Sequence, residues 1–136
     1  MCSILFTSKD IIDYDDVNYY LKFRGPDDTT IVKDEANNFT FVHNLLSMTG
    51  EFTRQPFQED GIICLYNGEI YNYKDFGDYK SDGYCIIDLY KRYGVEFVKK
   101  LDGEFAILLM DFNKDLILMV TDPFKTKPLF YSNVNN

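Results

Sequence analysis

The sequence predicts an α+β fold in which helices cover a layered core of strands. Two nearly continuous apolar segments, 104–112 and 116–121, are typical of strands covered on both faces. Residues 85–93 carry apolar side chains at helical spacing, which predicts an amphipathic helix outside that core. The chain is 46% hydrophobic and 17% aromatic, so it can bury a core. Its 136 residues lead us to expect one domain, 1–136.

The N-terminal half is expected to combine strands with one helix. Three segments read as strands because they are rich in apolar and β-branched residues: 2–7, 29–33 and 38–48. Residues 10–22 carry apolar side chains near helical spacing, and Asp10 can cap the helix that they predict. A Gly-Pro turn is expected at 24–27, and a loop at 50–60.

The segment 62–76, IICLYNGEIYNYKDF, is expected to begin as an apolar strand. Asn67-Gly68 then predicts a tight turn, because asparagine and glycine accept positive φ at little cost. Asp82 is a candidate N-cap for the helix that stops at Gly94. A second short helix is expected at 95–101.

Net charge and hydropathy exclude several classes of partner. The formal charge of -8 argues against nucleic acid, which requires basic patches. No apolar run reaches the roughly 20 residues of a membrane span, and no charged segment precedes a hydrophobic one as in a signal peptide. We therefore expect a soluble, cytoplasmic protein that binds neither nucleic acid nor membrane.

Three cysteines are present, and no pair has CxxC spacing, so we expect reduced thiols. Cys64 and Cys85 lie in apolar patterns and are expected in the core. Cys2 differs by its position. If Met1 is removed, Cys2 carries a thiol and a free α-amine, a nucleophile and a base on one residue. The alternative is that Cys2 only starts a buried strand.

The single histidine, His43, lies in a predicted strand. One histidine without ligand partners cannot form a metal site, and a hydrogen-bonded structural role is the preferred interpretation. No phosphate-binding loop is present. We expect neither a metal nor a cofactor.

Seven short motifs occur in an order that resembles one enzyme family: MCSI at 1–4, RGPD at 24–27, QP at 55–56, YNGEIYNY at 66–73, SD at 81–82, LDG at 101–103 and KPLFY at 127–131. They resemble the glutamine-hydrolysing domain of class II amidotransferases, in particular the asparagine-synthetase type. This resemblance implies a compact four-layer αββα sandwich of the N-terminal-nucleophile hydrolase type. It covers nearly the whole chain, and YNGEIYNY is its most specific part.

The resemblance also implies a mechanism. Cys2 would attack the side-chain amide of L-glutamine and form a thioester, with the Asn67 side chain and the Gly68 backbone N–H as oxyanion hole. Asp82 would bind the substrate ammonium, and Glu69 would at most order a loop. The SGGxDS string of an ATP-using synthetase domain does not occur in the sequence. Ammonia is therefore expected to pass to a separate synthetase.

The sequence departs from the family at the position that binds the glutamine carboxylate, where Leu45 replaces an arginine. Further departures are Phe23 for histidine, Tyr84 for glutamate and Thr121 for arginine. Arg54 is a possible substitute, because a carboxylate favours a planar bidentate donor, although it also fits a solvated loop. Three alternatives stay open: a degenerate domain that binds or regulates a partner, an amidohydrolase for amides without the carboxylate, and a plain structural protein.

Overall fold

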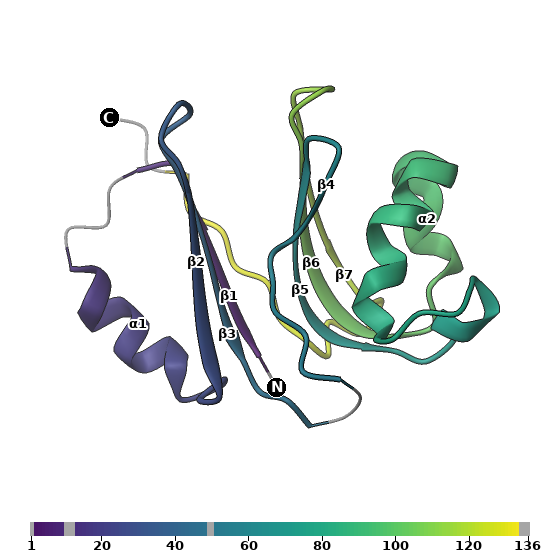
Figure 1. The fold of residues 1–136 in the computed structure, drawn as a ribbon, viewed down its shortest axis with the longest axis horizontal. Helices are drawn as coiled ribbons and strands as arrows, with labels where there is room; N and C mark the ends of the chain where they lie inside the picture. Colours follow the sequence, from purple (N-terminus) through teal and green to yellow (C-terminus); the bar gives the residue numbers. More distant parts are fainter. Residues whose placement is uncertain (1, 10–12, 49–50, 134–136) are drawn as a thin grey trace.

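The computed structural model describes residues 2–9, 13–48 and 51–133. Two antiparallel sheets lie face to face, with a helix on the outer side of each (Figure 1). The first sheet has the order β1-β3-β2, formed by Ser3–Thr7, Phe39–Leu45 and Asp28–Asp34. The second has the order β4-β5-β6-β7, formed by Phe57–Glu59, Ile62–Ile70, Gly103–Asp111 and Leu116–Thr121. The prediction of an α+β fold is confirmed.

The helices are short. Helix α1 (Tyr14–Lys22) covers the first sheet and α2 (Cys85–Tyr93) covers the second. Three 3₁₀ segments complete the structure: η1 (Tyr73–Asp75), η2 (Asp82–Tyr84) and η3 (Gly94–Lys100). No helix of the described residues is long and apolar enough to cross a membrane.

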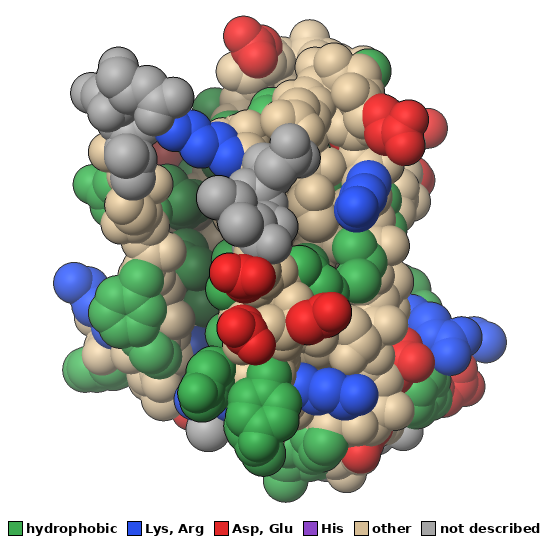
Figure 2. All heavy atoms as spheres, turned by 90° about the vertical axis from the view of Figure 1, so that its left-hand side faces the viewer, with side chains coloured by type: hydrophobic (Ala, Val, Ile, Leu, Met, Phe, Trp, Pro, Cys, Tyr) green, Lys and Arg blue, Asp and Glu red, His purple; other side chains and the backbone are tan. Residues whose placement is uncertain are grey.

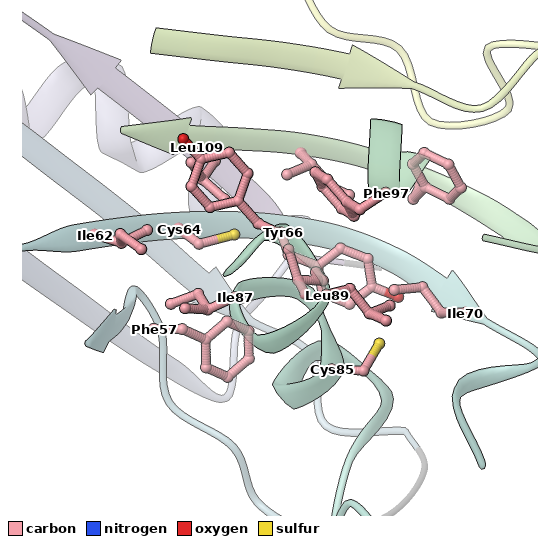
Figure 3. Packing of buried hydrophobic residues seen from close by; sticks show 14 residues of the cluster. Phe57, Ile62, Cys64, Tyr66, Ile70, Cys85, Ile87, Leu89, Phe97 and Leu109 are labelled. Atoms are coloured by element: carbon pink, nitrogen blue, oxygen red, sulfur yellow. The ribbon is translucent and has the colours of Figure 1, made fainter. Parts of the chain in front are cut away.

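The strands of the second sheet separate two clusters of buried side chains. The larger cluster lies between this sheet and α2, and it contains Cys64, Cys85 and Phe97 (Figure 3). The smaller cluster lies between the sheets, where Phe41 meets Leu65. Alternate residues of β5 therefore face opposite sides, as the pleat of a strand requires. The prediction that Cys64 and Cys85 belong to the core is confirmed.

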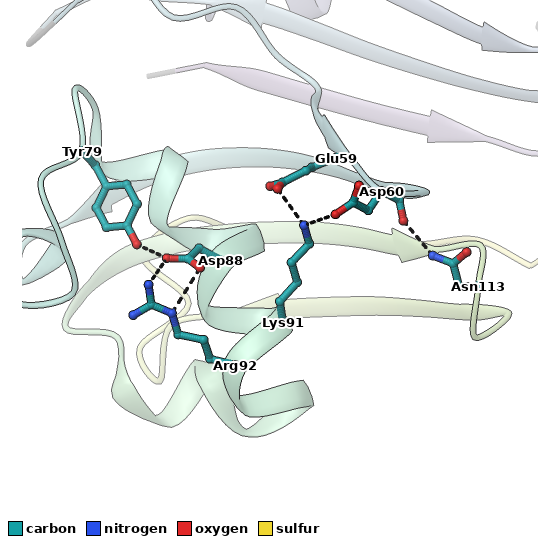
Figure 4. A network of polar contacts seen from close by, with 7 residues as sticks. All are labelled: Glu59, Asp60, Tyr79, Asp88, Lys91, Arg92 and Asn113. Carbon is teal, nitrogen blue, oxygen red and sulfur yellow. Dashed lines mark hydrogen bonds and ion pairs between the residues drawn. The ribbon is translucent and has the colours of Figure 1, made fainter.

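Ion pairs fix the outer face of α2 (Figure 4). The Lys91 ammonium lies 2.7 Å from a Glu59 carboxylate oxygen and 2.6 Å from one of Asp60, so the helix is tied to the β4–β5 hairpin. Asp88 pairs with Arg92 one turn later and accepts a hydrogen bond from the Tyr79 hydroxyl. These contacts hold the segment before α2 against the helix.

Helix α1 is attached less firmly, since none of its residues is buried. The Ser3 hydroxyl donates to the Leu21 carbonyl over 2.9 Å, and the Asn44 amide donates to Asn18 over the same distance. The α1 side of the molecule exposes hydrophobic and acidic side chains next to one another (Figure 2). The helix thus rests on the sheet through polar contacts and keeps aromatic rings in solvent.

Four sequence predictions about local structure need correction. Asn67-Gly68 forms no turn, because both residues lie inside β5 and pair with β6. The predicted loop 50–60 contains β4, and the helix predicted at 95–101 is the 3₁₀ segment η3. Asp82 is not an N-cap; it lies within η2 and caps no helix with its side chain. The proposed cap Asp10 lies outside the described residues.

Candidate active site

A pocket opens where the start of β1, the segment after β3, the C-terminal half of β5 and η2 meet. Four of the residues that the sequence singled out line it: Cys2, Gly68, Glu69 and Asp82. These residues come from three separate parts of the chain, and the packing of the two sheets against each other brings them together, because β1 and β5 belong to different sheets (Figure 1). The pocket is therefore the candidate active site.

Cys2 is half-buried and directly precedes β1. Its Sγ accepts a hydrogen bond from the Leu46 N–H over 3.4 Å. Burial raises the pKa of the Cys2 thiol; the Leu46 hydrogen bond opposes this, and the negative charges of Glu69 and Asp82 add to it. The thiol needs a base to become a nucleophile, because the thiolate is the reactive form.

Gly68 lies opposite Phe105 in the β5–β6 ladder. A Cβ atom at this position would lie 2.1 Å from the Glu104 carbonyl oxygen and 2.7 Å from the Phe105 Cα. Only glycine therefore allows β5 and β6 to approach this closely beside the pocket. The glycine that the sequence marked as a turn residue is required by close strand packing instead.

Asn67 is buried and precedes Gly68 in β5. By strand alternation its side chain faces the space between the sheets, as those of Ile63 and Leu65 do. Its Oδ1 has no hydrogen-bond partner among the described residues. Asn67 is next to the pocket but is not among the residues that line it.

Asp82 is held by three donors. Its carboxylate accepts hydrogen bonds from the Tyr66 hydroxyl, from the Ile70 N–H over 2.8 Å and from the Ser81 hydroxyl over 3.2 Å. Burial and the adjacent Asp82 charge raise the pKa of Tyr66, so the phenol remains a donor. A carboxylate has about four lone-pair sites, which leaves one for a ligand in the pocket.

Arg54 does not line the pocket. Its exposed guanidinium pairs with Asp28, with Nε 3.0 Å and Nη2 3.4 Å from the two carboxylate oxygens. Leu45 does line the pocket and is buried. The structure thus brings an apolar side chain into the site and leaves the predicted carboxylate ligand outside it.

Two pocket residues, Tyr66 and Gln55, lie in motifs that the sequence analysis named, but they were given no role there. The Gln55 Oε1 accepts the Tyr66 N–H over 2.7 Å, and Tyr66 in turn donates to Asp82. Together they connect the segment before β4 to η2. Tyr66 precedes Asn-Gly in the most specific motif, which was a usable signal, whereas nothing local marked Gln55 as buried.

His43 is buried between the sheets, and burial lowers its pKa to about 4, with the charge of Asp28 opposing this. Neither ring nitrogen has a hydrogen-bond partner among the described residues, so the predicted hydrogen-bonded role is not seen. No three His, Cys, Asp or Glu side chains within the described ranges are arranged to hold a metal ion.

Comparison with known proteins decides the family. A family model described as a glutamine amidotransferase domain matches residues 1–136. The chain is a class II glutamine amidotransferase domain. This amidotransferase domain is 36% identical over 127 residues to "Asparagine synthetase [glutamine-hydrolyzing] 2" of Bacillus subtilis, a match that covers 85% of the chain and 17% of that relative.

Other relatives of the amidotransferase domain are also much longer than it. It is 30% identical over 132 residues to "Asparagine synthetase [glutamine-hydrolyzing] 1" of Bacillus subtilis, covering 88% of the chain and 21% of the relative. It is 36% identical over 100 residues to "Amidase chyE" of Penicillium rubens, covering 65% of the chain and 14% of the relative. The chain thus spans about a fifth of the length of the asparagine synthetases that it matches.

Proposed function

We propose that this amidotransferase domain hydrolyses the side-chain carboxamide of L-glutamine to L-glutamate and ammonia through a thioester on Cys2. The observation that carries the proposal is the presence of Cys2, Gly68 and Asp82 in one pocket. The family membership supports the same chemistry and an αββα sandwich of the N-terminal-nucleophile type. The two facing sheets with one helix on each outer side agree with that fold.

The nucleophile requires activation, because burial raises the pKa of Cys2. Once Met1 is removed, the α-amine of Cys2, with an ordinary pKa of about 7.7 to 8.0, is the base that takes the thiol proton. The thiolate attacks the amide carbon, and the proton leaves with ammonia. Water then cleaves the thioester and regenerates the thiol.

The negative charge that develops on the amide oxygen requires hydrogen-bond donors. The Gly68 N–H and the Asn67 side-chain NH2 are the donors that we assign to it. Removing one such donor typically lowers turnover by about 10² to 10³. Asp82 binds the substrate ammonium at its remaining lone-pair site, and Glu69 orders the end of β5.

We propose that a synthetase accepts the ammonia, because two relatives of this domain are named glutamine-hydrolysing asparagine synthetases. A second candidate function, a catalytically degenerate subunit that binds a partner, is favoured by Leu45, which supplies no charge for a carboxylate.

Release of glutamate and ammonia from L-glutamine tests the proposal. We expect Cys2→Ala to lower this activity by at least about 10³, since the nucleophile is lost. Equal activity in Cys2→Ala would contradict the thioester mechanism. Absence of activity toward any carboxamide, in folded protein that lacks Met1, would favour the degenerate subunit.

A further inference from the structure

The lining side chains differ in what they offer to the charged groups of a ligand. Three of the described lining residues are acidic, Glu51, Glu69 and Asp82, and none is lysine or arginine. An apolar side chain, that of Leu45, forms another part of the wall. The side chains that line the pocket thus offer acceptors for an ammonium group and no basic group for a carboxylate.

The basic residues nearest in sequence to the lining residues, Arg54 and Lys80, form ion pairs outside the pocket. Arg54 lies between two lining residues, but its guanidinium pairs with Asp28. The Lys80 ammonium, 75% exposed, lies 3.7 Å from a Glu51 carboxylate oxygen. Neither residue lines the pocket. To gain a positive side-chain partner from either residue, a ligand carboxylate would have to break one of these ion pairs.

Free glutamine brings both an ammonium and a carboxylate. Asp82 is suited to the ammonium, because one lone-pair site remains beside its three donors. The carboxylate would lie beside an apolar wall, and no lysine or arginine is among the described lining residues. An unpaired charge at a partly desolvated position weakens binding strongly.

We propose that the preferred substrate is a glutamine residue with a free ammonium group and an uncharged α-carbonyl, as at the N-terminus of a peptide. This inference rests on the proposed function and narrows its substrate class. The ammonium binds Asp82, and the neutral carbonyl lies against the Leu45 side chain, where it needs no positive partner.

The bonds that form and break are the same as in the hydrolysis of free glutamine. The Cys2 sulfur forms a bond to the side-chain carbonyl carbon, and the bond from that carbon to nitrogen breaks with release of ammonia. Water hydrolyses the thioester, which gives a side-chain carboxylate and the free thiol. The product is a peptide that begins with glutamate.

The substrate preference of the wild-type protein is tested with three substrates: L-glutamine, L-glutamine α-amide and the dipeptide glutaminyl-glycine. We would measure ammonia release at about pH 8, where an α-amine of pKa about 7.7 to 8.0 is present in both forms, so the substrate can supply an ammonium and Cys2 a neutral base. We expect kcat/KM for the α-amide to exceed that for L-glutamine by at least about tenfold, with most of the difference in KM. The dipeptide is expected to resemble the α-amide.

Two variants test the cause of this preference. Leu45→Arg adds a cation to the wall and is expected to lower the ratio of kcat/KM for the α-amide to kcat/KM for L-glutamine. The matched control Leu45→Met keeps the wall apolar and should keep the wild-type ratio. Because a buried arginine can impair folding, Glu51→Gln serves as a second test. It removes one negative charge at an exposed position and is expected to shift the ratio in the same direction.

The outcomes separate the two proposals. Turnover of L-glutamine equal to or faster than that of its α-amide would overturn the substrate inference and leave the Cys2 reaction intact. Absence of turnover for all three substrates, in folded protein that lacks Met1, would overturn both. A preference for the α-amide that Glu51→Gln and Leu45→Arg leave unchanged would overturn the charge argument.

Discussion

At the scale of single residues, the buried imidazole of His43 makes stability depend on pH. Burial lowers its pKa from 6.5 to about 4 in the folded state. Below pH 6.5 the unfolded chain binds this proton more readily, so the free energy of unfolding falls as the pH drops from 6.5 to 4. The full loss is roughly 3 kcal/mol. Urea unfolding at several pH values in this range would measure it.

His43→Phe provides the control, since it keeps an aromatic ring and removes the titrating group. We expect the variant to show little pH dependence between 6.5 and 4. The carboxylates with lowered pKa, such as Asp28 and Asp122, lose their stabilising effect only below their ordinary value of 3.8. An equal fall in stability for wild type and variant would contradict the assignment to His43.

Gly68 is expected to tolerate no side chain. In Gly68→Ala the new Cβ would meet the β6 backbone at 2.1 Å, so β5 or β6 must move. We expect a loss of at least about 2 kcal/mol in the free energy of unfolding. Gly94→Ala is the matched control, because Gly94 has φ +59 but a Cβ added there would meet no atom within 4 Å. It should cost only about 1 kcal/mol, and equal losses would argue against a clash at Gly68.

Single residues were predictable from the sequence only where an ordered motif named them. The family motifs pointed to Cys2 and Asp82, and the structure brings both into one pocket. The turn predicted at Asn67-Gly68 was wrong, because a local preference for positive φ cannot reveal that Ala106 and Phe105 of β6 lie opposite. The buried state of Gln55 likewise depends on a distant partner, Tyr66.

At the scale of elements, one carboxylate organises the turn after β7. Asp122 is buried and accepts the N–H groups of Phe105, Phe124 and Thr126 over 3.1, 2.9 and 3.0 Å. Burial opposes its ionisation, but these hydrogen bonds outweigh burial and lower the pKa of Asp122. The turn is thus joined to the start of β6 through a side chain.

Asp122→Ala leaves several backbone donors without an acceptor. We expect the free energy of unfolding to fall by roughly 3 to 5 kcal/mol. Thermal or urea unfolding measures the loss, and Asp78→Ala, at an exposed position, is expected to stay within about 0.5 kcal/mol of wild type. Similar small effects for both variants would contradict the role assigned to Asp122.

Long, strongly patterned elements could be predicted from the sequence, whereas short ones could not. Strands β6 and β7 were expected because their segments are nearly continuously apolar, and helix α2 because its apolar residues follow helical spacing. Strand β4 has only three residues, Phe57–Glu59, and exists because β5 pairs with it. The strand forms through pairing with β5, which no local sequence pattern predicts.

At the scale of the whole molecule, the layering could be expected but not the arrangement within the layers. Apolar strands and amphipathic helices indicated helices outside a layered core. The order β1-β3-β2 in one sheet and β4-β5-β6-β7 in the other depends on pairing between distant segments. The packing of the two sheets then places Cys2, just before β1, near the C-terminal half of β5, and so it forms the pocket.

In the proposed reaction Cys2 is a processed nucleophile in a glutamine-binding pocket. Intact-mass measurement before and after incubation with millimolar 6-diazo-5-oxo-norleucine, a glutamine-like electrophile, tests both properties together. We predict a protein without Met1 that gains one adduct, and no adduct on Cys2→Ala. Retained Met1, or folded wild-type protein without an adduct, would contradict the proposed reaction.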